Sequence, residues 1–278
     1  MKVDNPYRTP IKGMTIFKAF LLVFLCVIFI HVIGFFFKVG FLYSLFESYF
    51  HNSVVVKNQL NTYSYIISYF VFTLIGFRIN NYEIPFFSKL SFFSYFIVII
   101  LGALWFIIDL FLIDLFLMKY LGKVTFKMVE RNYFDLKGIM RYLASFLSVA
   151  FTIGAIGHGL LRNYTFRSVT LVLVSFSLFF LNPILVFELL LQNLILIYIY
   201  YQFQAFQLCL LFVFTRLVME VLIVLRYSYH SMLYGNVIKN EIIGNGTIYY
   251  LLIAIVFCLF LYILYSFRNL KRTHTWLR

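Results

Sequence analysis

Charged residues are scarce in this chain, and their scarcity determines its class. Only 12% of the 278 residues are Asp, Glu, Lys or Arg, whereas 63% are hydrophobic. Because soluble domains carry about 25% charged residues, the composition argues against a soluble globular domain. Several apolar runs also reach the roughly 20 residues that a helix needs to cross a bilayer. The sequence therefore predicts a multi-pass membrane protein.

Cysteines and alternating strand patterns are also rare. The three cysteines, Cys26, Cys209 and Cys258, lie in separate apolar runs, so their spacing forms neither a disulfide framework nor a metal-binding knuckle. Segments of about ten residues with alternating hydrophobicity, which are typical of membrane barrels, do not appear. We therefore expect an all-α fold.

Acidic residues are outnumbered by basic ones, with 23 Lys and Arg against 10 Asp and Glu and a net charge of +13. The basic residues lie mostly at the ends of apolar runs and in the tails. This position is typical of contact with lipid headgroups, so the lipid bilayer is the expected partner and nucleic acid is not. The first apolar run is long and has no small-residue cleavage site, which predicts a retained helix and not a signal peptide.

The apolar runs predict about eight transmembrane helices in a single integral membrane domain, residues 1–278. We divide this domain into N-terminal helices and amphipathic segments (1–140), a core (141–225), and a last helix with a basic tail (226–278). Amphipathic composition in GFLYSLFESYF at 40–50, within the mixed stretch 38–62, and at 119–141 predicts segments that lie on the membrane surface. The helices are expected at about 15–37, 63–77, 91–118, 141–161, 167–181, 184–202, 205–225 and 247–267.

Polar residues within these apolar stretches are the candidate contacts with a cavity or a partner. Such residues are costly in hydrocarbon, so they usually face a bundle interior or a site. Packing within the bundle is the simpler explanation for each of them. The candidates are His158, Arg162, Asn182, Glu188, Gln192, Asn193, Arg216 and Glu220.

Local spacing suggests partners for several charged residues. Arg216 and Glu220 lie four residues apart on one helix face, which predicts an ion pair within that helix. Asp109 and Asp114 lie about 140° apart around their helix. Both are expected to reach the headgroups, where Asp114 would meet Lys119 or Lys123.

The histidines do not form a recognisable catalytic or metal-binding pattern. His158 is expected to form hydrogen bonds at the membrane interface beside Arg162. No two histidines have the i, i+4 spacing of a zinc-binding helix, and neither a Ser–His–Asp grouping nor a Gly-rich phosphate loop can be identified. We therefore assign no catalytic, metal-binding or cofactor-binding residue.

Three short motifs nevertheless follow one another with a familiar spacing. They are GLLRNYTF at 159–166, FSLFFLNP at 176–183, and IYIYYQF at 197–203 followed by Cys209. Over about residues 140–220 the chain resembles the CPBP family of bacterial intramembrane metalloproteases, which includes CAAX prenyl proteases and bacteriocin-processing (Abi) enzymes. The resemblance implies a CPBP-like helical core in a bacterial inner membrane. The basic residues of the two tails favour cytoplasmic termini. The basic 119–141 segment conflicts with that orientation under the positive-inside rule.

The residues that the resemblance assigns to metal binding are missing from this chain. In the family, a pair of glutamates and two histidines hold the metal. Here the glutamate positions fall on Ser148 and Val149, and the following arginine position falls on Ile153. The first histidine position falls on Phe180, and the second histidine and its asparagine fall on Val213 and Leu217.

A shift of register does not restore the set, because residues 142–163 contain no Asp or Glu. The resemblance therefore implies a catalytically degenerate member, or pseudoprotease, without metal or cofactor. It would serve as a partner or scaffold for another integral membrane protein, or bind a peptide or lipid. Two alternatives remain: an active metalloprotease with a shifted site, and a small transporter or channel subunit that uses Asp109, Asp114, Arg216 and Glu220.

Overall fold

The structure is a computed structural model of the chain. It describes residues 13–39, 53–81, 90–120, 136–177, 183–227 and 246–274. Side chains are described over 13–37, 60–81, 90–109, 139–176, 190–222, 248 and 250–267. Over these ranges the secondary structure is helical, without any strand. The expectation of an all-α protein is therefore confirmed.

The chain divides into two compact units, which are described separately. The first unit comprises residues 1–86 and 132–201, and the second comprises residues 87–131 and 202–278. Each unit thus combines segments that are distant in the sequence. The helix Pro183–Phe203 extends just past residue 201, where the first unit ends. Gln204 follows this helix and turns the chain with a positive φ of 52°.

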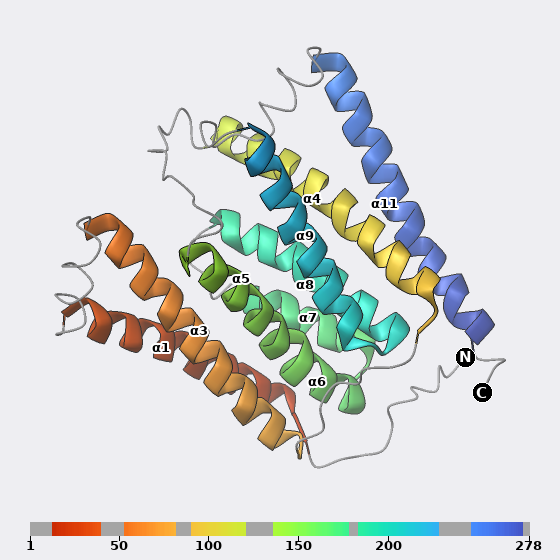
Figure 1. Cartoon of the computed structure of the whole chain (residues 1–278). Helices are drawn as coiled ribbons and strands as arrows, with labels where there is room; N and C mark the ends of the chain where they lie inside the picture. Colours follow the sequence, from red (N-terminus) through yellow and green to blue (C-terminus); the bar gives the residue numbers. More distant parts are fainter. Residues whose placement is uncertain are drawn as a thin grey trace. The chain divides into compact units, whose positions relative to one another are not determined.

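The first unit is built on the pair α1 (Ile16–Val39) and α3 (Ser53–Ile79), which run side by side (Figure 1). A continuous helical segment packs against α3. It consists of α5 (Leu136–Val149), the π-helix η1 (Ala150–Gly157) and α6 (His158–Asn163). The unit is completed by α7 (Phe166–Ser177) and α8 (Pro183–Phe203).

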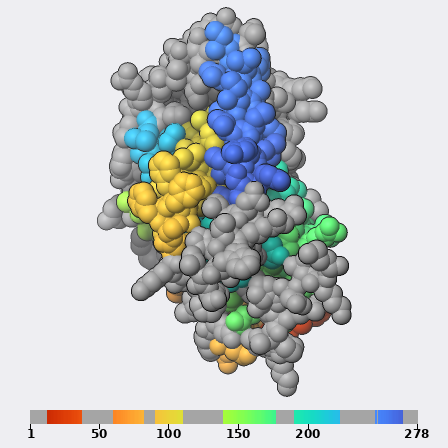
Figure 2. All heavy atoms as spheres, turned by 90° about the vertical axis from the view of Figure 1, so that its right-hand side faces the viewer, coloured from red at the N-terminus to blue at the C-terminus, as the bar shows by residue number. Residues whose placement is uncertain are grey.

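In the second unit the structure describes three long helices, α4 (Phe92–Tyr120), α9 (Phe206–Tyr227) and α11 (Gly246–His274). Both α9 and α11 pack against α4. Figure 2 shows α4 and α11 next to each other on one face of the molecule. The α4–α11 contact includes the rings of Trp105 and Phe260, whose centroids are 5.9 Å apart.

Five helices in the described part of the chain are long and apolar enough to cross a membrane. Their apolar stretches are Ile16–Phe37, Leu60–Ile79, Phe92–Asp109, Ile139–Asn163 and Tyr250–Phe267. Large apolar side chains cover their outer faces, for example Phe24 on α1 and Leu251 on α11, which are 49% and 61% exposed. Such a belt is typical of contact with lipid. Association with a membrane is therefore supported, whereas eight separate spans stay a prediction.

The surface segment predicted at 40–50 lies outside the described residues. The helix predicted at 63–77 begins ten residues earlier than expected, because α3 starts at Ser53. The polar residues Lys57, Asn58, Asn61 and Thr62 lower the hydropathy there, which obscured the helix in the sequence. Leu60 is nevertheless buried, because this turn packs inside the unit. Residues 40–52 and 121–135, which include most of the second predicted surface segment, lie outside the described residues.

Candidate functional site

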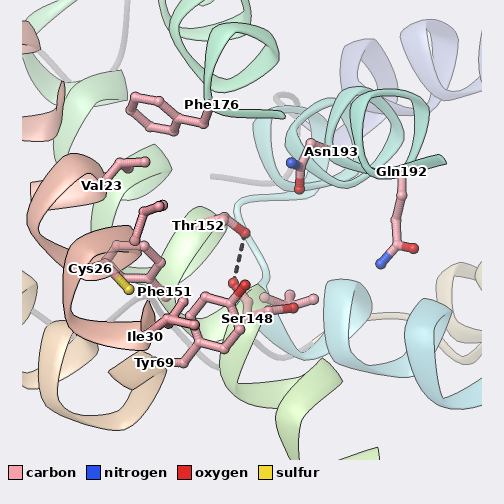
Figure 3. Close-up of a pocket in the computed structure, with 12 residues that line it drawn as sticks. Val23, Cys26, Ile30, Tyr69, Ser148, Phe151, Thr152, Phe176, Gln192 and Asn193 are labelled. Carbon is pink, nitrogen blue, oxygen red and sulfur yellow. Dashed lines mark hydrogen bonds between the residues drawn. The ribbon is translucent and has the colours of Figure 1, made fainter. Parts of the chain in front are cut away.

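A cavity inside the first unit is the candidate site (Figure 3). Side chains from α1, α3, α5, η1, α7 and α8 line it. It leaves about 40 Å³ for the centres of water-sized molecules. Half of the described lining is polar but uncharged, namely Cys26, Tyr69, Ser148, Thr152, Gln192 and Asn193.

The two hydroxyl groups on the α5–η1 wall donate within their own helix. Ser148 Oγ donates to the carbonyl oxygen of Ser145 at 2.8 Å, and Thr152 Oγ1 donates to that of Ser148 at 2.8 Å. Hydroxyls that bond to the preceding turn bend helices and satisfy their own protons. Ser148 is therefore held as a wall residue, and none of the described lining residues is a histidine or carboxylate that could activate it.

The amide groups of α8 form the opposite wall. Gln192 and Asn193 are 6% and 8% exposed, and both line the cavity. In Figure 3 the Asn193 amide projects from α8 toward the wall that carries Ser148 and Thr152. Within the part of the chain that the structure describes, this amide makes no hydrogen bond to another residue.

The π-helix η1 supplies part of this wall and was not anticipated, since we expected an uninterrupted helix at 141–161. A π-helix differs from an α-helix in hydrogen-bond register, and short π segments occur frequently at functional sites. Asn80, at the end of α3, donates from Nδ2 to the carbonyl oxygen of Ala155 at 2.6 Å. This side chain thereby satisfies a carbonyl within the widened turns and fixes η1 against α3.

The GLLRNYTF motif has a structural role at the start of α1. A Cβ added to Gly159 would overlap the Asn80 amide and lie 2.7 Å from Cβ of Met14. Asn163 Nδ2 donates to the carbonyl oxygen of Met14 at 2.9 Å, and the hydroxyl of Tyr164 accepts from the backbone N–H of Ile16 at 3.5 Å. The spacing of this motif therefore joins α6 to the first turn of α1.

His158 corrects an expectation from the sequence. We expected it at the membrane interface, but its side chain is fully buried. Its Nδ1 forms a 2.6 Å hydrogen bond with the hydroxyl of Tyr200 on α8. Packing inside the first unit therefore buries His158, although it lies near the end of an apolar run. Arg162, four residues further on, is partly exposed.

The second unit contains an ion pair that the sequence did not predict, between a buried aspartate and a partly buried arginine. Arg216 Nη2 lies 2.9 Å from Asp109 Oδ2, which joins α9 to α4. The expectation that Asp109 reaches the headgroups is wrong, since the residue is 3% exposed. Glu220, the partner predicted for Arg216, is partly exposed on α9. The side chain of Asp114 lies outside the described residues.

The remaining predicted positions are divided between the units or not described. Asn182 and Phe180 lie outside the described residues, and so does the side chain of Glu188. Val213 and Leu217 are buried on α9, in the second unit. Ile153 is completely buried in η1. Among the described positions that the resemblance assigns to metal binding, Ser148 and Val149 line the cavity.

These residues do not fit a metal centre. Over the described ranges, no three His, Cys, Asp or Glu side chains gather closely enough to hold an ion. The cavity offers amide and hydroxyl groups and a single thiol, which is not the ligand set of a catalytic zinc site. What the arrangement can do chemically is exchange neutral hydrogen bonds with a small group.

Three comparisons with known proteins add no relative: neither a protein-family model nor a curated protein nor a solved structure matches the chain.

Proposed function

We propose that this is a non-catalytic integral membrane protein whose CPBP-like core binds a ligand in the cavity of the first unit and does not cleave it. The observation that carries this proposal is the composition of the cavity wall. Ser148 and Val149 stand where the resemblance expects a pair of glutamates, and both line the cavity. These two wall positions therefore carry neutral side chains, where a protease of that family would carry carboxylates.

The chemistry of peptide-bond hydrolysis supports this interpretation. An intramembrane metalloprotease needs ligands for the ion and a carboxylate that takes a proton from the attacking water. Aspartate, glutamate and histidine are absent from the lining in the described part of the chain. His158 is the nearest candidate in the sequence, but its buried ring is held by Tyr200 and does not line the cavity.

The wider setting belongs to the same proposal. The protein would cross the bacterial inner membrane with eight helices and keep both termini in the cytoplasm. Its partner would be another integral membrane protein or a peptide, for which it acts as a binding or scaffold subunit. The outer faces of α1 and α11, which carry Phe24 and Leu251 among other large apolar side chains, suit contact with lipid or with a second membrane protein.

The alternative of a small transporter or channel subunit relies on charges within the membrane, and one observation bears on it. Asp109 is paired with Arg216 at 2.9 Å, so the charges of these two residues neutralise each other. An intramembrane ion pair marks either a transport path or a structural joint. The neutral cavity in the first unit favours binding over transport.

Metal analysis combined with a proteolysis assay tests the proposal. The detergent-purified full chain and an active intramembrane metalloprotease are measured in parallel for zinc and cobalt and for cleavage of a transmembrane peptide. We expect the control to contain about one ion per chain and this protein to contain almost none and to be inactive. A stoichiometric ion that is lost in the His158→Ala or Glu220→Ala variant, together with cleavage, would overturn the proposal in favour of a shifted active site.

A further inference from the structure

We propose that the cavity of the first unit binds the uncharged, hydrogen-bonding head of a single-chain lipid such as a monoacylglycerol. This inference rests on the proposed binding function and adds the chemical class of the ligand. It depends on three properties of the cavity: polar groups that lack partners, the absence of charge from the described lining, and an apolar side formed by α1.

The unpartnered polar groups come from α8 and α3. The Asn193 amide is 8% exposed and lines the cavity without a hydrogen bond to another described residue. Tyr69 packs its ring against Tyr65 and Phe151, at centroid distances of 6.0 and 5.9 Å. Its hydroxyl likewise makes no hydrogen bond within the described part of the chain. These groups face the cavity with hydrogen-bonding capacity that no described residue uses, so a ligand that offers a donor and an acceptor can bond to them.

The lack of charge selects against ionic headgroups. The polar lining consists of amides, hydroxyls and the Cys26 thiol, and the described lining contains no Lys, Arg, His, Asp or Glu. A carboxylate or phosphate placed here would lose its hydration without gaining a counter-charge. The alcohol and ester groups of a glycerol head instead exchange hydrogen bonds with an amide and a phenol.

The size of the cavity and its apolar side suit a small head attached to hydrocarbon. The space inside the cavity is small, with about 40 Å³ for the centres of water-sized molecules, which suits a compact head better than a bulky one. Val23, Val27 and Ile30 of α1 form the apolar side. Near this side, Phe176 makes an edge-to-face contact with Phe20 at 5.3 Å, between α7 and α1.

The first experiment compares two probes that differ in charge, 1-oleoylglycerol and oleate, by native mass spectrometry of the detergent-purified full chain. We expect one 1-oleoylglycerol per chain and at least tenfold weaker retention of oleate. Asn193→Leu removes the amide at similar volume and should reduce retention of 1-oleoylglycerol at least tenfold. Gln207→Leu is the matched control in the second unit, where Gln207 donates to the Tyr95 hydroxyl at 3.2 Å, and it should retain the lipid.

A second measurement avoids any change in the hydrogen-bonding wall. In a Cys209→Ser, Cys258→Ser background, Cys26 is the single thiol and lines the cavity. We expect 1-oleoylglycerol to slow its labelling by a neutral maleimide several-fold. A chain that keeps only Cys258, which is exposed on α11, should be labelled at the same rate with or without the lipid.

The outcomes separate this inference from the proposed function. Equal, Asn193-dependent retention of oleate would overturn the neutral-lipid class while supporting a binding cavity. Retention that Asn193→Leu leaves unchanged, together with unprotected Cys26, would overturn the site itself. Bound metal and peptide cleavage would overturn the proposed function, whichever lipid is retained.

Discussion

The two units bury their polar groups by different means. In the first unit the polar groups at the cavity are neutral, and part of their hydrogen-bonding capacity faces open space. In the second unit a carboxylate and a guanidinium, Asp109 and Arg216, meet at 2.9 Å in close packing. The first arrangement leaves capacity for a ligand. The second arrangement uses an ion pair to join two helices of the protein itself.

The packing around glycine, in contrast, is similar in the two units. In the second unit, a Cβ on Gly102 of α4 would lie 3.0 Å from the carbonyl oxygen of Phe212 and 3.0 Å from Cβ of Thr215 on α9. Close approach of two helices at a small residue is typical of membrane bundles. In the first unit, Gly76 and Ala155 make a similar approach between α3 and η1. The cavity is therefore local, because the helices that line it are closely packed next to it.

The largest effect is expected from breaking the ion pair of the second unit. Arg216→Met leaves the Asp109 carboxylate buried without its guanidinium, which costs about 3–5 kcal/mol in buried pairs. The double variant Asp109→Leu, Arg216→Met removes both charges and should recover most of that stability. Unfolding free energies of the purified chain in mixed micelles check this. Equal losses in the single and double variants would show that the pair has no coupling energy.

A smaller loss is expected at the GLLRNYTF motif of the first unit. Gly159→Ala places a methyl group against the Asn80 amide and Cβ of Met14, and overpacking of this kind costs about 1–3 kcal/mol. Gly34→Ala is the matched control, because its Cβ would lie 3.5 Å from Ser64 Oγ, an ordinary contact. The control should be neutral or slightly stabilising, since alanine favours helix over glycine. Equal melting temperatures for both variants would contradict the close approach.

A comparable or smaller loss is expected from the hydrogen bond that joins α6 to α8. Tyr200→Phe removes the hydroxyl that lies 2.6 Å from His158 Nδ1, and leaving a buried polar group without its partner costs about 1–3 kcal/mol. Tyr262→Phe removes the same atom from an exposed position on α11 and should leave the melting temperature unchanged. If both variants melted like the parent, the His158–Tyr200 bond would not stabilise the first unit.

Those features that depend on local composition were predictable from the sequence. The apolar run expected at 15–37 corresponds to α1 at Ile16–Val39, because hydrophobic length alone determines such a helix. The predicted helix at 205–225 corresponds to α9 at Phe206–Tyr227 for the same reason. Gln192 and Asn193 are candidate contacts with a cavity because they are polar residues in an apolar helix, and both line the cavity in the structure.

Features that depend on contacts between helices were not predictable from the sequence. The pairing of Asp109 with Arg216 joins residues more than a hundred positions apart, whereas spacing within a helix suggested Glu220. The π-helix η1 has the same apolar composition as an α-helix and differs in its hydrogen bonds. The burial of His158 likewise depends on α8, which no local pattern reveals.

The smallest effect on stability, and the sharpest contrast between the units, is expected for Asn193→Leu in lipid-free protein. The Asn193 amide is buried without a described partner, so its removal sacrifices no hydrogen bond there. Replacing an unsatisfied polar group by an apolar one of similar size is nearly neutral or stabilising. We therefore expect an unchanged or slightly higher melting temperature without lipid, and a loss of the stabilisation that 1-oleoylglycerol gives the parent chain.

The effect of Asn193→Leu on stability without lipid and its effect with lipid together distinguish a ligand-binding residue from a structural one. A residue that only holds the bundle together lowers stability when it is changed, as expected for Arg216, with or without lipid. A residue kept for a ligand costs nothing in the empty protein and matters only when the ligand is present. If Asn193→Leu destabilised the lipid-free chain by as much as Tyr200→Phe, Asn193 would be structural, and the neutral cavity would be a packing defect of the first unit and not a binding site.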